Sequence, residues 1–186
     1  MAKRVLKHAI LGLLRKQDMS GYDITSEFTK EISQFWSAKH SQIYTELKKL
    51  LDEKLIEQYI EISGVKLEKK MYTLTEEGKK ELAQWLMHPE QIPETEKDTF
   101  ALKVYFIQYI PEEKILPLFQ DQLDQREQKL SELKSRYQLI FAQREEEIGL
   151  GSDELGHYLV LTKAISREES YVDWLKKSIR FIRQKK

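Results

Sequence analysis

The chain has 186 residues, of which 33% are charged and 40% hydrophobic, a composition typical of a folded, helix-rich protein rather than a disordered one. No apolar run is long enough to span a bilayer and the N-terminus does not form a signal peptide, so we expect a cytoplasmic protein that binds no membrane. The absence of cysteine excludes disulfides, thiolate metal sites and thiol catalysis, and agrees with a reducing compartment.

The net charge is zero, but the charge is unevenly distributed along the chain. Residues 1–70 contain 13 Lys and Arg against 10 Asp and Glu, whereas residues 71–186 contain 18 against 21. A modestly basic N-terminal part joined to an acidic C-terminal part is the pattern expected of a DNA-reading module attached to a separate scaffold.

The first 56 residues predict three helices. A single apolar stripe over residues 3–16 predicts the first, and Ser20 followed by Asp23 is a start signal for the second. The third falls within residues 35–56, with a start offered by Ser37. Its inward-facing residues, at helical spacing, are Ile43, Leu47, Leu50, Leu51 and Leu55.

The period then changes from helical to strand-like. Residues 57–62 and 69–75 are short, rich in β-branched and aromatic residues, and separated by a turn-prone segment, which predicts a hairpin. Its expected cationic tip carries Lys66, Lys69 and Lys70, and Thr75 is positioned to cap a fourth helix. Three helices followed by a two-stranded hairpin is the winged helix-turn-helix plan.

The breaker segment 88–94 suggests a domain boundary, so we expect a DNA-binding domain over residues 1–88 and a helical dimerisation domain over 89–186. Residues 98–110 are apolar nearly all round, which predicts a helix buried on several sides. A long helix should follow from about Glu112 to Glu147, extending about 50 Å. Pro117 predicts a kink or a later start in that helix.

Heptad seams run along this long helix and along the last helix of the chain, interrupted in the first by Arg126. A coiled-coil-like homodimer is favoured over an intramolecular helical hairpin, because little else is available to cover both seams. The residues predicted to mediate dimerisation are Leu116, Phe119, Leu123, Leu130, Leu133, Tyr137, Tyr158, Ile165, Val172 and Ile179. The fold class is therefore mostly α with a small β-hairpin.

The outer face of the third helix is suited to DNA. In a winged helix the second helix of the helix-turn-helix enters the major groove, where Ser41 and Gln42 would reach base edges. Tyr44, Lys48 and Lys49 are suited to phosphates, and Lys66 and Lys69 of the hairpin to the adjacent backbone. The alternative is that these lysines only solvate the surface.

Several motifs resemble those of the PadR family of bacterial transcriptional regulators. They are GYDI, FWSAKHSQIYTELKKL, KLEKKMYTLT, IPET, KDTFALKVYF and GHYLVLTKAI, and together they cover nearly the whole chain. The resemblance implies a homodimeric repressor held together by its C-terminal helices and bound to an inverted-repeat operator. It also implies release by phenolic acids such as p-coumarate or ferulate, which would derepress a phenolic acid decarboxylase gene.

A phenolic acid needs apolar walls, a cationic or donor group for its carboxylate and a partner for its hydroxyl. The junction of the two domains is the expected place, because a ligand there would change the spacing of the reading helices. The candidate pocket residues are Ile10, His40, Lys66, Tyr105, Phe106 and His157. Ordinary packing is the alternative role for Tyr105 and His157.

Other function classes find less support. The chain has no glycine-rich phosphate loop or nucleophile elbow, and its four histidines lack metal-ligand spacing, so we expect no enzyme, cofactor or metal. The acidic run Glu145–Glu147 is interpreted as the solvated end of the long helix. Two alternatives stay open: a related regulator that responds to drugs or other aromatic compounds, and a helical protein-interaction adaptor.

Overall fold

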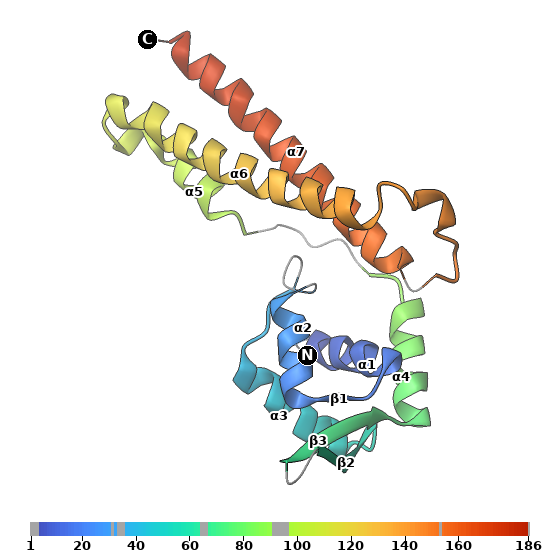
Figure 1. Cartoon of the computed structure of the whole chain (residues 1–186). Helices are drawn as coiled ribbons and strands as arrows, with labels where there is room; N and C mark the ends of the chain where they lie inside the picture. Colours follow the sequence, from blue (N-terminus) through green and yellow to red (C-terminus); the bar gives the residue numbers. More distant parts are fainter. Residues whose placement is uncertain are drawn as a thin grey trace. The chain divides into compact units, whose positions relative to one another are not determined.

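The computed structural model describes residues 4–30, 32, 36–63, 67–90, 97–152 and 154–185. The chain forms two compact units, Met1–Pro93 and Glu94–Lys186 (Figure 1). Each unit buries apolar side chains of its own. The described part is mostly helical with one small antiparallel sheet, so the predicted fold class is confirmed. None of its helices is long and apolar enough to cross a membrane.

Three helices build the core of the N-terminal unit: α1 (Val5–Lys16), α2 (Gly21–Thr29) and α3 (His40–Asp52). The predicted start signal of α2 is confirmed, because the Ser20 hydroxyl accepts from the Asp23 backbone N–H while the Asp23 carboxylate accepts from the Ser20 N–H. The buried residues contributed by the three helices are Ile10, Leu11, Leu13, Leu14, Ile24, Phe28, Ile43, Leu47 and Leu50.

The start of α3 differs from the prediction. Ser37 does not cap the helix, which begins three residues later at His40. The physical reason is the side chain of Gln42, whose Oε1 accepts from the Lys39 backbone N–H at 2.9 Å and so closes the first turn at that point. Phe35 lies outside the described residues.

The predicted two-stranded hairpin is present and is extended by a third strand. Strands β2 (Ile56–Ser63) and β3 (Leu67–Leu74) form the expected antiparallel hairpin, and β1 (Met19–Ser20) pairs with the other side of β3. A strand of two residues is too short to show an alternating pattern, so β1 was not predicted. Lys69 and Lys70 lie within β3, paired with Glu61 and Ile60, rather than at the hairpin tip.

Helix α4 (Glu76–Met87) closes the N-terminal unit. Its predicted cap is confirmed, because the Thr75 hydroxyl accepts from the Gly78 N–H at 3.1 Å. The ring of Trp85 stacks on His8 of α1 with centroids 4.6 Å apart. This stacking fixes α4 against α1.

The C-terminal unit contains α5 (Thr99–Tyr105), the 3-10 turns η2 (Ile107–Tyr109) and η3 (Glu145–Glu147), and the long helices α6 (Glu112–Ile140) and α7 (Leu155–Arg183). Helices α6 and α7 lie side by side and antiparallel (Figure 1). One buried cluster joins Phe119 and Leu123 to Val172, Leu175 and Ile179, and the second contains Leu133, Phe141, Leu161 and Ala164.

This pairing overturns the preference against an intramolecular helical hairpin. The seam of α6 and the seam of α7 face each other within one chain, because the short segment 141–154 turns the chain back on itself. Each apolar stripe therefore covers much of the other within one chain, although five of the ten seam residues stay only partly buried.

Three further details of this unit differ from the predictions. Among the large apolar side chains of α5 only Phe100 is buried, while Leu102 and Tyr105 are exposed, so the helix is not buried on several sides. Helix α6 begins at Glu112 as predicted but ends at Ile140 instead of Glu147. Of the kink or later start expected at Pro117, the later start does not occur. The helix continues through Pro117 on an exposed face, where water can bind the carbonyl of Glu113 that loses its partner.

Candidate nucleic-acid interface

The predicted outer face of α3 is exposed. Ile43, Leu47 and Leu50 fix the helix against the core, which leaves another face of the helix open to solvent. The exposed side chains on it include Ser41, Gln42, Tyr44, Thr45, Lys48 and Lys49. Ser41 and Gln42 occupy the first turn, where a recognition helix reaches base edges.

Gln42 caps this helix and keeps further hydrogen-bonding positions. Its Oε1 accepts from the Lys39 backbone N–H, which caps α3. A primary amide also has a second lone pair and two N–H donors, so the cap uses only one of its hydrogen-bonding positions. The remaining donors and lone pair can form the paired contact that adenine offers in the major groove.

Two exposed tyrosines extend this face to α2. Tyr22, near the start of α2, is 76% exposed, and Tyr44 of α3 lies against the ring of His40 with centroids 4.5 Å apart. A hollow of about 500 Å³ lies between α2, α3 and β3. It is lined by Ser20, Gly21, Tyr22, Tyr44, Glu68, Lys69, Lys70 and Tyr72.

The residues predicted to bind DNA do not include three that line this hollow, namely Gly21, Tyr22 and Lys70. The motif GYDI contains the first two, but a motif does not reveal that Tyr22 points to solvent rather than into the core. Lys70 was recognised as part of a cationic cluster on the hairpin, and its position in β3 brings it to this hollow.

Of the hairpin lysines, Lys69 forms an ion pair within the N-terminal unit. Lys69 pairs with Asp23 of α2, with Nζ and Oδ2 2.8 Å apart. The hydrogen bond from Lys69, followed by that from Ser20, holds the pKa of Asp23 below its ordinary value. Lys69 therefore fastens β3 to the start of α2, and its contact with a phosphate stays a prediction. Lys66 lies outside the described residues.

The predicted effector residues occupy different environments. Ile10 is wholly buried in the core of the N-terminal unit, whereas His40 is exposed at the start of α3. In the C-terminal unit Tyr105 and Phe106 touch edge to face, with centroids 5.1 Å apart and Tyr105 76% exposed. His157 instead meets Phe141 at 5.2 Å beside the second core cluster.

The residues predicted to mediate dimerisation pack between two helices of the same chain. Phe119, Leu123, Leu133, Val172 and Ile179 are buried between α6 and α7, and Leu116, Leu130, Tyr137, Tyr158 and Ile165 pack at the edges of these clusters. A role of the ten residues between two subunits stays a prediction.

The acidic run after α6 is not simply a solvated helix end. Glu145 accepts hydrogen bonds from the hydroxyls of Tyr137 and Tyr158. The bond to Glu145 is the main cause that raises the pKa of Tyr137 to about 12. Glu145 thus ties the end of α6 to the start of α7.

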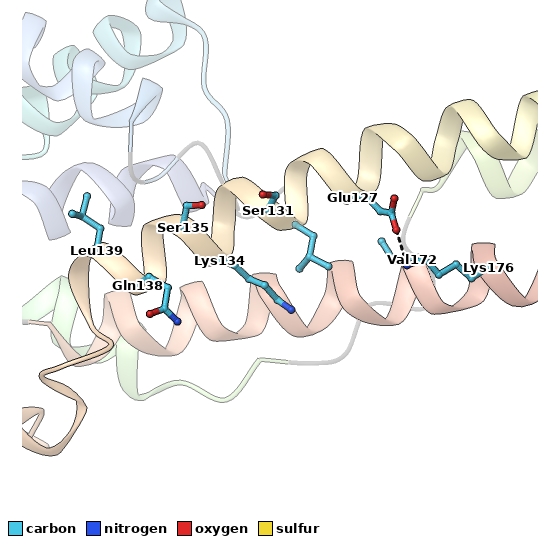
Figure 2. Close-up of a pocket in the computed structure, with 9 residues that line it drawn as sticks. Glu127, Ser131, Lys134, Ser135, Gln138, Leu139, Val172 and Lys176 are labelled. Atoms are coloured by element: carbon cyan, nitrogen blue, oxygen red, sulfur yellow. Dashed lines mark ion pairs between the residues drawn. The ribbon is translucent and has the colours of Figure 1, made fainter.

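A groove of about 820 Å³ follows the α6–α7 hairpin (Figure 2). Leu130 and Val172 contribute apolar surface to it, and Leu139 at one end is 86% exposed. The ion pair between Glu127 and Lys176, with an N–O distance of 2.6 Å, lies at the other end. Within the described residues, no group of three or more His, Cys, Asp or Glu could hold a metal ion.

Comparison with known proteins identifies the relatives of the chain. Residues 10–84 match the Transcriptional regulator PadR-like family, and residues 96–183 match the family described as Virulence activator alpha C-term. The Negative transcriptional regulator PadR of Bacillus subtilis is 56% identical over 179 residues, which cover 96% of this chain and 98% of the relative.

Solved structures agree with this relationship. The crystal structure of Bacillus subtilis PadR in complex with operator DNA matches with a TM-score of 0.88 and 55% identity, and covers 96% of this chain and 99% of the other. The structure of the same protein with p-coumaric acid matches with a TM-score of 0.81 and 52% identity at the same coverage. The chain therefore belongs to the PadR-like family of transcriptional regulators.

Proposed function

We propose that this protein is a transcriptional repressor that binds an inverted-repeat operator as a homodimer and is released by a phenolic acid. The observation that carries the proposal is the 56% identity, over nearly the full length of both chains, to a negative transcriptional regulator with structures in complex with operator DNA and with p-coumaric acid. A phenolic acid decarboxylase gene is the proposed target. A bacterial operator lies in the cytoplasm, so the proposal implies a cytoplasmic protein.

The DNA contacts follow from the exposed face of α3. Ser41 and Gln42 read base edges in the major groove, while Tyr44, Lys48 and Lys49 bind phosphates. Tyr22, Lys66, Lys69 and Lys70 extend the phosphate contacts from the start of α2 and from the hairpin. Two such helices enter successive major grooves when they are about 34 Å apart, which requires a dimer.

The dimer is proposed to form through the C-terminal unit. Because α6 and α7 cover much of each other's seams, the interface would use the exposed sides of the five predicted residues that are only partly buried, together with apolar side chains left outside the hairpin. The five are Leu116, Leu130, Tyr137, Tyr158 and Ile165. Leu139, Leu159 and Phe181 are exposed apolar side chains of the two long helices. A second copy would remove them from water.

The effector acts by favouring one arrangement of the dimer. A phenolic acid that binds more tightly to a dimer with the wrong helix spacing shifts the population away from the DNA-competent state. The coupling cannot exceed the difference in affinity for the two states, typically about 1–3 kcal/mol. His40, Tyr105, Phe106 and His157 remain the proposed effector residues, together with Lys66. Ile10, being wholly buried, would need a rearrangement of the core to form a wall.

A gel-shift titration tests the proposal. A duplex is first selected by the wild-type protein from a random-sequence pool, and its affinity is then measured with and without saturating p-coumarate. We expect weaker binding, by about 5–150-fold, in the presence of the acid. Unchanged affinity would refute the effector assignment, and a response to other aromatic compounds alone would favour the drug-responsive alternative.

The salt dependence of binding to the same duplex distinguishes a DNA-binding protein from a protein-interaction adaptor. Binding that neutralises phosphates releases counterions, so affinity should fall steeply as salt is raised. If the pool yields no enriched duplex and no salt-dependent binding, the chain is better described as a helical adaptor.

A further inference from the structure

The ring of Tyr44 lies directly on the start of α2. An ideal Cβ built on Gly21 would lie 2.8 Å from both Cζ and Oη of Tyr44 and 2.9 Å from its Cε1. Real Cβ atoms essentially never approach other heavy atoms so closely, so any side chain at position 21 would displace the ring. The place that Tyr44 occupies therefore depends on the absence of a side chain at Gly21.

A second neighbour holds the same ring. His40, one helical turn earlier on α3, lies against Tyr44 with ring centroids 4.5 Å apart and the ring planes inclined by 33°. Gly21 itself is buried, while Tyr44 keeps 40% of its surface exposed. The ring is thus fixed by two contacts while part of it stays open to a ligand.

We propose that Gly21 is a positioning residue of the nucleic-acid interface, acting through Tyr44. This inference rests on the proposed function. The Tyr44 hydroxyl is suited to donate a hydrogen bond to a DNA phosphate, and such a bond requires an O–O distance of about 2.7–2.8 Å. Gly21 and His40 hold the ring in place before DNA arrives, so binding does not have to order it.

The size of the displacement decides whether the contact survives. An alanine at position 21 would push the end of the Tyr44 ring outward until carbon atoms are about 3.5 Å apart, a shift of more than half an ångström. Binding groups need to be held within about 0.5 Å of their productive position. Tyr44 would therefore lose its hydrogen bond to the phosphate or form it with poor geometry.

The fold itself should tolerate this change. Gly21 has an ordinary helical backbone, so alanine adds no backbone strain there. The atoms in its way belong to the far end of a partly exposed side chain that can move into solvent. The conflict thus affects the interface and leaves the core intact.

Two other glycines of the same unit provide controls. Gly12, within α1, has nothing within 4 Å of its ideal Cβ, so Gly12→Ala adds a methyl group in open space. Gly78 of α4 faces the backbone carbonyl of Leu55 and, at 2.6 Å, the Cδ1 of Leu74, so Gly78→Ala forces the backbone apart. The three positions differ in what an added methyl group meets: nothing, a side-chain end or the backbone.

The experiment compares these three alanine variants in the full chain. Thermal unfolding is followed by circular dichroism, and affinity for the duplex selected by the wild-type protein is measured by fluorescence anisotropy. We expect Gly12→Ala to bind DNA like the wild type and to unfold at the same or a slightly higher temperature, because alanine stabilises a helix interior relative to glycine. Gly78→Ala should unfold at a clearly lower temperature. Gly21→Ala should keep nearly the wild-type unfolding temperature and bind DNA at least about tenfold more weakly, the size expected for one lost hydrogen bond to a charged group.

A double-variant cycle shows whether Gly21 acts through Tyr44. Once Tyr44→Ala has removed the ring, adding Gly21→Ala should not weaken DNA binding further. The inference is overturned if Gly21→Ala binds as the wild type does, if it weakens binding equally without the ring, if it unfolds like Gly78→Ala, or if Tyr44→Ala itself leaves binding unchanged. Failure of the wild-type protein to select any duplex would refute the proposed function instead.

Discussion

Arg126 of α6 donates a hydrogen bond from Nη1 to Oε2 of Glu168 on α7 at 2.8 Å, and Glu168 is fully buried. The Arg126 guanidinium also lies 3.9 Å from the centroid of the Tyr171 ring. Lys129 and Arg167 approach the other oxygen of Glu168 at 3.5 and 3.1 Å. The charged residue that interrupts the α6 seam is thus the partner of a buried carboxylate on the facing helix.

Replacing Arg126 with methionine should destabilise the C-terminal unit by about 3 kcal/mol. Removing one partner of a buried pair leaves the other charge buried, which costs about 3–5 kcal/mol, and the cations of Lys129 and Arg167 keep the loss near the lower end. The free energy of unfolding in urea measures this. The double variant Arg126→Met/Glu168→Met should recover most of the loss, because no charge then remains buried. As a control, Lys176→Ala removes the exposed pair with Glu127 and should cost less than about 1 kcal/mol.

The same pair should make stability depend on acid pH. Burial alone would raise the pKa of Glu168, but the hydrogen bond from Arg126 and the charges of Arg126 and Lys129 lower that pKa below the ordinary value for glutamate. Because the pKa is lower in the folded than in the unfolded chain, the stabilisation is complete above about pH 4.3 and is lost as the pH falls through the folded pKa. Melting temperatures of the wild type and Glu168→Gln should therefore converge on acidification. A difference that widens below this pH would contradict the assignment.

At Gln42, two substitutions separate capping from DNA reading. Gln42→Glu keeps a side-chain oxygen for the Lys39 N–H but loses the amide donors and adds a charge that the phosphates repel. We expect its melting temperature to stay near that of the wild type. The free energy of operator binding should become less favourable by about 1–3 kcal/mol or more. Gln42→Ala should lose both the cap and the DNA contact. If Gln42→Glu binds the selected duplex as tightly as the wild type, Gln42 does not read a base.

Lys48→Ala should weaken binding to all duplexes to a similar degree. A phosphate contact carries no sequence information, so specific and scrambled DNA should lose affinity together, and the slope of affinity against salt should decrease by about one per contact. Anisotropy titrations at several salt concentrations measure the slope. Lys176→Ala removes one positive charge from the C-terminal unit and should leave the slope of affinity against salt unchanged. A loss confined to the selected duplex would identify Lys48 as a base-reading residue.

Local signals predicted the N-terminal unit well. The S-x-x-D pair at Ser20, the Thr75 cap and the alternating strands each depend on neighbouring residues, and all three are present. The start of α3 was misplaced because Ser37 and Gln42 both offer a cap, and only the structure shows that Gln42 takes it.

Contacts between distant segments could not be predicted in the same way. Heptad spacing reveals that a helix has an apolar stripe but not which helix covers it, so the spacing alone could not predict that α6 and α7 pack on each other within one chain. Arg126 was visible as an exception, yet nothing near it in sequence indicates Glu168, 42 residues later. The Asp23–Lys69 pair and the fit of Tyr44 over Gly21 likewise depend on how separate elements pack.

Asp98, near the start of the C-terminal unit, caps α5 and is also bonded to α7. Asp98 accepts from the Ala101 N–H of α5 through one oxygen and from the Tyr171 hydroxyl of α7, at 2.7 Å, through the other. The start of α5 is thus joined to the middle of the 29-residue helix α7, so a displacement of Asp98 would be passed directly to α7 at Tyr171.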